Sequence, residues 1–149
     1  MTTNNNDSFD YLLRTQFSFT ADDPALANLL KGIADQKINI NAFAQLKGND
    51  TNYVRLVVGS SEAEAPIELQ SVRRILRSLK IRFQEKQVIQ IIRLRAGRAG
   101  QIDDIYSALW CKVEVRSIYI GEKTNVYVDS TDLDQVIAIL SSENIEPCS

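Results

Sequence analysis

Residues 26–33 read Leu-Ala-Asn-Leu-Leu-Lys-Gly-Ile, and residues 102–109 read Ile-Asp-Asp-Ile-Tyr-Ser-Ala-Leu. In both stretches the first, fourth, fifth and eighth positions are apolar or aromatic, which is the spacing of one face of an amphipathic helix. Residues 69–76 and 133–140 likewise share Leu, Val, Ile and Leu at their first, fourth, seventh and eighth positions. Each copy is too long for a solenoid unit, so the sequence predicts two related domains in tandem.

Alternating apolar residues and turn-forming residues between these helices complete each copy. The first copy is predicted to have strands over 14–20, 38–42, 53–58 and from 81 onward, and helices from the Asp22-Asp23-Pro24 turn to about 36 and over 67–79. The second copy is predicted to have strands over 88–95, 113–120 and 124–129, and helices over 101–110 and 132–142. A constant offset between the copies leaves only residues 145–149 for its last strand.

The order β-α-β-β-α-β is that of the ferredoxin-like unit. The predicted fold class is therefore α+β, with two ferredoxin-like domains in tandem, the second with a truncated last strand. The predicted boundaries are a polar leader over 1–13, a first domain over 14–86 and a second domain over 87–149. The apolar phase changes after Gln87 without a Gly, Pro or Ser linker, which predicts a bend or bulge and a nearly rigid connection.

The chain has 149 residues, two cysteines and no histidine. Without histidine there is no Ser-His or Cys-His nucleophile, so we expect no catalysis, metal or cofactor, although carboxylate or lysine chemistry stays open. We expect no disulfide framework from Cys111 and Cys148, and we place Trp110 and Cys111 in the core between the domains. The sequence has no apolar run of membrane-spanning length and no signal peptide, which predicts a cytoplasmic protein without a membrane partner.

Positive charge is concentrated in one segment. Between Val72 and Arg98 there are nine Arg or Lys residues and one acidic residue, Glu85, whereas the whole chain has a net charge of −2. Arg73, Arg77 and Lys80 have the spacing of one helix face. This basic 72–98 segment is interpreted either as a solvated surface or as a site for an anion or an acidic partner.

The motifs at the start of each copy resemble those of the ACT domain family, which has a strand, a Pro-Gly-x-Leu turn into the first helix and a Gly-Ile-Asn-Ile-like second strand. The first copy has Asp23-Pro24-Ala25-Leu26 and then Lys37-Ile38-Asn39-Ile40-Asn41. The second copy has Ala99-Gly100-Gln101-Ile102 and then Lys112-Val113-Glu114-Val115-Arg116. The second copy keeps the family glycine, at Gly100, but has Ala99 where proline is usual. In the first copy Pro24 stands in the glycine's place.

The resemblance implies a regulatory protein that binds a small amino acid between this turn and the second strand of a neighbouring domain. Glycine and a helix N-terminus would bring N–H groups close to a ligand carboxylate. The corresponding residues are Arg98, Ala99, Gly100 and Gln101 in the second copy; Asp22, Asp23, Pro24 and Ala25 in the first; and Asn39 and Asn41 on the second strand. Gly100 can equally be only a turn residue, and the two asparagines can simply cover a solvated strand face.

Other functions remain open. The chain can be a scaffold or regulatory subunit that docks on an enzyme or other partner through the basic segment and binds no ligand. The RNA recognition motif has the same β-α-β-β-α-β order, but the third strands lack its aromatic run, so we expect no nucleic-acid partner. An enzyme of the acylphosphatase type shares the topology, without convincing spacing of its residues here.

The stunted last strand also leads to a prediction about self-association. It would leave one edge of the 88–95 strand without a partner, and an exposed apolar edge is normally covered. The Phe9–Leu13 segment, the fourth strand of the first copy or a second chain could cover it. Because ACT-like domains commonly pair edge to edge or helix to helix, we predict a symmetric homodimer.

Overall fold

The computed structural model describes residues 8–149, so the first seven residues of the predicted leader lie outside the described part. The elements are β1 (Asp10–Ala21), α1 (Asp23–Asp35), β2 (Ile40–Gly48), β3 (Thr51–Val58), α2 (Pro66–Ser78), β4 (Phe83–Ile92), α3 (Gln101–Leu109), β5 (Val115–Ile120), the 3₁₀ turn η1 (Glu122–Thr124), β6 (Val126–Ser130) and α4 (Leu133–Leu140). The strands form one antiparallel sheet in the order β2-β3-β1-β4-β6-β5. The predicted α+β class and the two ferredoxin-like units are confirmed.

Both ferredoxin-like units use the two long central strands. β1 and β4 pair in one uninterrupted register, from Asp10 opposite Ile92 to Phe19 opposite Phe83. The C-terminal half of β1 also pairs with β3, and the C-terminal half of β4 also pairs with β6. The order β2-β3-β1-β4 is thus the sheet of the first unit, and β1-β4-β6-β5 is the sheet of the second unit.

The N-terminal half of β1 takes the place of the last strand of the second unit. Residues 141–149 after α4 form no strand, as the truncated last strand predicted. Instead, residues 10–13 pair with β4, so the prediction that they belong to a polar leader is wrong. The β4 edge is therefore covered within the same chain, by the first of the three covers that the sequence suggested, and not by a second chain.

The predicted bend or bulge in the connecting strand is wrong, because β4 runs straight through it. The alternation of apolar and polar residues changes along β4 because the N-terminal half of the strand buries only one face, whereas residues 88–91 are buried on both faces. Phe83 packs on the first core, Ile89 and Ile91 belong to the second core, and Val88 lies on the opposite face of the strand from them. The junction of the two domains is thus inside a strand rather than between two strands.

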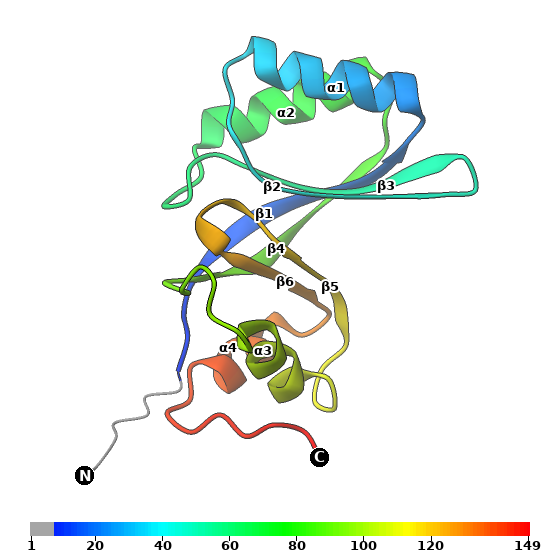
Figure 1. The fold of residues 1–149 in the computed structure, drawn as a ribbon. Helices are drawn as coiled ribbons and strands as arrows, with labels where there is room; N and C mark the ends of the chain where they lie inside the picture. Colours follow the sequence, from blue (N-terminus) through cyan, green and yellow to red (C-terminus); the bar gives the residue numbers. More distant parts are fainter. Residues whose placement is uncertain (1–7) are drawn as a thin grey trace.

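The helix pairs lie on opposite sides of the curled sheet (Figure 1). α1 and α2 cover a core that includes Phe17 and Leu56, and α3 and α4 cover a core that includes Ile91 and Leu109. The two outer strands, β2 and β5, approach each other at a single bridge between Ala42 and Gly121. A Cβ atom on Gly121 would lie 2.5 Å from the backbone oxygen of Asn41, so this approach of the two edges requires glycine.

The inner face of the curled sheet is buried and largely polar. Arg14 is 1% exposed; it donates hydrogen bonds to Oε1 of Gln90 (2.8 Å) and to the backbone oxygen of Val58 (2.7 Å). On the same face Gln16 donates to Asp129 (3.1 Å), whose other oxygen accepts from Nζ of Lys86 (2.6 Å). Because these groups come from strands of both units, the polar network joins the units, as expected for buried polar groups that need partners.

Two expectations about the cysteine region are wrong. Cys111 and Cys148 form a disulfide, with Cα atoms 5.8 Å apart, which is an ordinary separation for such a bond. Trp110 is 49% exposed and Cys111 is also exposed, so neither fills a core between the domains. Both follow α3 at the outer end of the second unit, far from the shared strands. Across residues 8–149, no helix has the length and apolar character that a membrane crossing requires.

Candidate functional site

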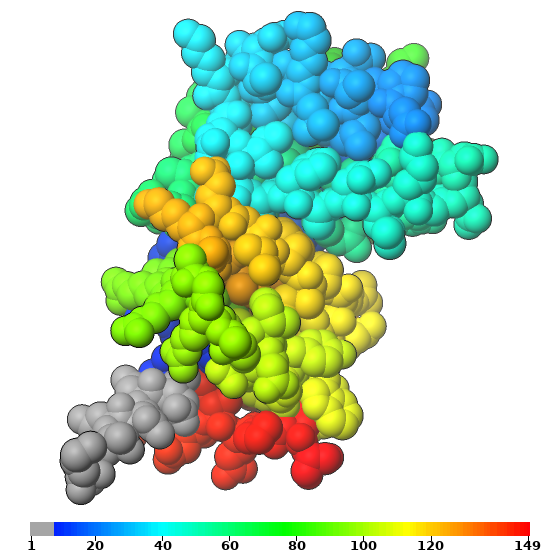
Figure 2. All heavy atoms as spheres, in the orientation of Figure 1, coloured from blue at the N-terminus to red at the C-terminus, as the bar shows by residue number. Residues whose placement is uncertain are grey.

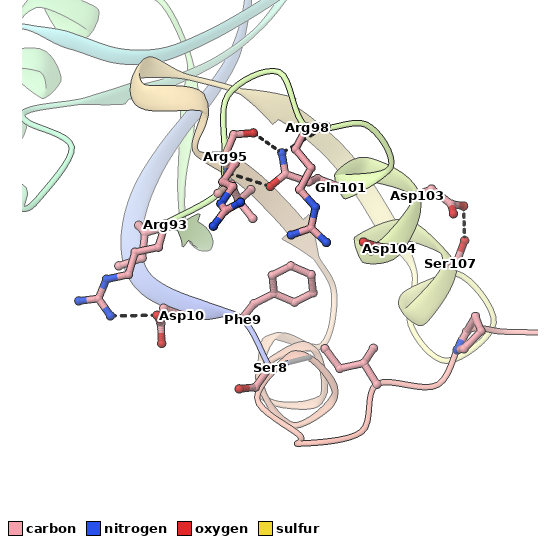
Figure 3. A pocket seen from close by; sticks show the side chains of 14 residues that line it. Ser8, Phe9, Asp10, Arg93, Arg95, Arg98, Gln101, Asp103, Asp104 and Ser107 are labelled. Carbon is pink, nitrogen blue, oxygen red and sulfur yellow. Dashed lines mark hydrogen bonds and ion pairs between the residues drawn. The ribbon is translucent and has the colours of Figure 1, made fainter. Parts of the chain in front are cut away.

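A hollow of about 450 Å³ lies where the second unit meets the start of the chain. Its walls are the beginning of β1, the loop between β4 and α3, the first two turns of α3 and the C-terminal tail. In the view of Figure 3 the ring of Phe9 lies near the centre of the hollow, and the side chains of Arg95 and Arg98 point toward it from the loop. The hollow therefore combines the predicted turn with segments from both chain ends.

The arginines of the loop are not equivalent. Arg93 donates to Asp10 at the beginning of β1 (2.9 Å) and thereby ties the loop to the first strand. The guanidinium groups of Arg95 and Arg98 have no ion-pair partner among residues 8–149, and both side chains are exposed. They are the cations that the hollow offers to an incoming anion.

The loop is shaped by glycines and by one side-chain amide. Gly97 has φ = +79° and Gly100 has φ = +91°, a backbone region that other residues rarely adopt. The amide of Gln101 accepts from the backbone N–H of Arg95 (3.0 Å) and donates to its oxygen (2.6 Å), as a neighbouring strand would. Gly100 caps α3 without a side-chain hydrogen bond, so the first N–H groups of that helix keep their capacity to bind an anion.

Two carboxylates also line the hollow. Asp103 and Asp104 lie in the first turn of α3, and both line the hollow. Asp103 accepts a hydrogen bond from Oγ of Ser107 (2.7 Å), which fixes its orientation. Cationic and anionic groups within one hollow match the two charged ends of a zwitterion.

The turn of the first unit is closed by its own residues. Asp22 caps α1 by accepting from the N–H of Ala25 (2.9 Å), and Pro24 lies in the first turn of the helix. Asp23 accepts from Asn52 and Lys47 (both 2.7 Å), and these hydrogen bonds, that from Asn52 first, lower the pKa of its carboxyl group. Both aspartates therefore already have partners within the protein.

The two predicted asparagines lie apart from the hollow. Asn39 donates to the backbone oxygen of Gly59 (2.9 Å) and to the carboxylate of Glu122, so it connects the two units. Asn41 is 1% exposed, and neither polar atom of its side chain has a hydrogen-bond partner within the described chain. The structure thus separates Asn39, Asn41 and the 22–25 turn from the loop of the second unit.

Of the predicted loop residues, Arg98 and Gln101 line the main hollow. Gly100 lines a smaller adjoining hollow with Ile120 and Thr124, and Ala99 is exposed. Sequence reasoning did not find Phe9 or the tail residues as parts of the site. Their position depends on pairing between distant segments, which leaves no local pattern.

The residues described by the structure contain no group of three or more Cys, Asp or Glu side chains placed to hold a metal ion. The hollow is accordingly assessed for an organic ligand. The side chains that line it carry guanidinium groups, carboxylates, two hydroxyls, one amide and apolar groups, with one aromatic ring.

No family model and no curated protein matches the sequence. Solved structures do resemble it: protein BT0572 from Bacteroides thetaiotaomicron has a TM-score of 0.67 at 16% identity over 87% of this chain and 88% of that one. The regulatory subunit of aspartate kinase from Thermus flavus has a TM-score of 0.56 at 11% identity, over 88% and 92%. Aspartokinase III of E. coli, in complex with aspartate and ADP, has a TM-score of 0.56 at 18% identity, over 97% of this chain and 35% of that one.

At these identities the likeness is one of fold. The fold of two βαββαβ units is the one that the repeated pattern and the motifs at the strand-to-helix turns predicted. The chain therefore has the fold of two ACT-type domains in tandem.

Proposed function

We propose that this chain is a regulatory protein without catalysis of its own, which binds a small amino acid in the hollow at the start of α3. The observation that carries the proposal is the pair of unpartnered guanidinium groups, Arg95 and Arg98, in a hollow that Asp103 and Asp104 also line. A carboxylate can accept bidentate hydrogen bonds from an arginine, and the N-terminus of α3 adds a favourable dipole. The aspartates can accept from the ammonium group.

The apolar part of the hollow would receive the side chain of the ligand. Phe9, Leu94 and Ile145 all pack against the second core and also line the hollow. They leave apolar surface next to the charged groups, as is typical of small-molecule sites. The size and polarity of the ligand side chain would be set by these three residues.

The fold supports a regulatory role. One structure with this fold is a regulatory subunit of aspartate kinase, and another, aspartokinase III of E. coli, is in complex with lysine and aspartate. By analogy, binding here would change how the chain acts on an enzyme or another regulator. The first unit, whose turn is closed by Asp22 and Asp23, would not bind the ligand.

A thermal-shift screen of the twenty amino acids tests the proposal. A ligand at 100 times its dissociation constant stabilises the folded state by about 2.7 kcal/mol, which is roughly 5–10 °C for a chain of this size. Arg98→Gln removes a charge-assisted hydrogen bond of about 1.5–3 kcal/mol and should weaken binding by about tenfold or more. Arg74→Gln, on the exposed side of α2, is the matched control. If no amino acid at millimolar concentration shifts the transition, the binding proposal fails.

A scaffold that docks through the basic segment is the second candidate. Arg73 pairs with Glu85 (2.7 Å), and Arg77 lies over the ring of Phe83 (5.7 Å to its centre). Arg74 is exposed and, within residues 8–149, has no ion-pair partner. An acidic partner that binds wild-type protein but not an Arg74→Glu variant, in the absence of any amino acid, would favour this function.

The proposed homodimer now depends on a different surface, since β4 is covered. Ile102, Tyr106 and Trp110 follow one another at intervals of four along α3 and are 41%, 46% and 49% exposed. Pairing of α3 with the same helix of a second chain would bury these side chains. Light scattering at micromolar concentration should report about twice 16.8 kDa. A monomer would exclude this association.

A further inference from the structure

We propose that the Cys111–Cys148 disulfide is a thiol–disulfide exchange site that controls the ligand hollow. The part that concerns the hollow rests on the function proposed above, whereas the release of the tail does not. The substrate of the exchange is a dithiol reductant, either a small molecule or a protein with a reactive dithiol.

The C-terminal tail, residues 141–149, forms one wall of the hollow. Ile145 and Pro147 line it, and Ile145 also packs against the second core. In Figure 2 the tail, in red, lies at the surface at one end of the molecule, beyond α3. The hollow is therefore complete only while the tail stays on α3.

Few interactions hold the end of the tail. The backbone N–H of Cys148 donates to the oxygen of Ser107 (2.6 Å), and Nζ of Lys112 donates to the oxygen of Glu146 (3.2 Å). The tail contains no strand or helix that would add a ladder of hydrogen bonds. The disulfide is thus the one covalent attachment of a segment that is otherwise held by a few contacts.

The position of the bond suits exchange. Cys111 is an exposed residue just after α3, on the surface where a reductant would approach. The N–H of Cys111 donates to Sγ of Cys148 (3.1 Å). A hydrogen bond of this kind stabilises a thiolate, which makes Cys148 the better leaving group.

The exchange proceeds in two balanced steps. A thiolate of the reductant attacks Sγ of Cys111, the S–S bond breaks, and Cys148 leaves as a thiolate that takes up a proton. The second thiol of the reductant then attacks the mixed disulfide and releases Cys111 as a thiol. Two electrons and two protons pass to the protein, and the reductant becomes a disulfide.

Breaking the bond should not unfold the units, because the disulfide joins the turn after α3 to the tail after α4, and neither cysteine lies in a strand or helix. The released tail takes Pro147 and Ile145 away from the hollow. The apolar wall is then lost while Arg95 and Arg98 stay in place. Reduction should therefore weaken ligand binding by about tenfold, as loss of apolar contact with one or two side chains implies.

The experiment compares oxidised and dithiothreitol-treated full-length protein with a Cys148→Ser variant. Amide hydrogen exchange of residues 141–149 reports the tail, and the thermal shift with each of the twenty amino acids at 1 mM reports the hollow. We expect reduction to speed exchange in the tail at least tenfold and to shrink the shift, with the variant behaving as reduced protein under both conditions. Ser71→Ala, in α2, serves as a variant that keeps the disulfide.

The outcomes separate the two proposals. A tail that stays protected after reduction, or a bond that resists dithiothreitol in the folded protein, overturns the exchange site. Faster exchange in the tail with an unchanged thermal shift overturns its control of the hollow. If the oxidised protein responds to no amino acid, the proposed function fails, while tail exchange still decides whether the disulfide holds the tail.

Discussion

Two buried tyrosines stack in the inner face of the sheet, and removal of each hydroxyl should have opposite consequences. The rings of Tyr119 and Tyr127 are 5.4 Å apart and nearly parallel. The hydroxyl of Tyr119 donates to Oε1 of Gln16 (2.7 Å), whereas the hydroxyl of Tyr127 has no partner among the residues that the structure describes. Substitution by phenylalanine keeps both rings and their stacking, so only the hydroxyl is tested.

Tyr119→Phe removes a hydrogen bond and leaves the acceptor on Gln16 buried and unpaired. The expected loss in unfolding free energy is about 2 kcal/mol, most of which comes from leaving the buried Gln16 oxygen without a hydrogen-bond donor. Tyr127→Phe removes a buried hydroxyl without a partner, so it should be neutral within about 0.5 kcal/mol or stabilising. For a chain of this size the first variant should melt roughly 4–8 °C lower, and the second should melt at or above the wild-type temperature.

Urea unfolding followed by circular dichroism measures both variants against wild type. Equal slopes in urea would show that the difference in midpoint is a difference in stability and not in the denatured state. A larger loss for Tyr127→Phe than for Tyr119→Phe would refute the hydrogen-bond assignment of the inner face. The double variant measures the interaction energy between the two hydroxyls, which is its loss of stability minus the sum of the losses of the two single variants. This energy should be small because the contact between the rings is kept.

Three further predictions follow from the packing and the charges. Gly121→Ala should destabilise the protein by about 1–3 kcal/mol, because the new methyl group would lie 2.5 Å from a backbone oxygen. Gly48→Ala is the control: its Cβ would meet only a ring atom at 3.5 Å, so it should be nearly neutral in the same urea assay. Deletion of residues 1–13 uncovers half of β4 and should lower the melting temperature and increase the particle mass in light scattering; an unchanged temperature and an unchanged mass would contradict the role of β1. Burial raises the pKa of Tyr127 to about 12 and that of Tyr119 further, so the folded state binds these two protons more tightly than the unfolded state does. The free energy of unfolding should therefore be unaffected by these groups below pH 10 and should fall as the pH rises toward 12. In the double phenylalanine variant this fall should be less steep.

The local features of the fold were predictable from the sequence. The four helices begin and end within two residues of their predicted limits, because the apolar faces repeat with helical spacing and the turns before α1 and α3 contain Asp-Pro and Gly. The loop at Gly100 was found for the same reason. These features are fixed by neighbours along the chain.

The pairing of distant segments was not predictable. The sequence offered the Phe9–Leu13 segment as one of three possible covers for the β4 edge, but nothing in the pattern of residues 10–13 selects it over the other two. Arg14 and Gln16 lie on the strand face opposite Phe17 and Phe19 and so resemble a solvated face, yet both are 1% exposed because the sheet curls around them. The disulfide likewise depends on a Cα separation that only the folded chain defines.

The shared strands make the second unit depend on the beginning of the chain. During synthesis β1 is made first, but its partner β4 emerges only after about half of the chain has followed, and the second unit stays incomplete until the same early strand is available to it. Such sequence-distant pairing raises the contact order and slows folding. The second half expressed alone, residues 87–149, lacks β1 and should give no folded circular dichroism spectrum, whereas a fragment that ends at Ile92 contains every strand of the first unit.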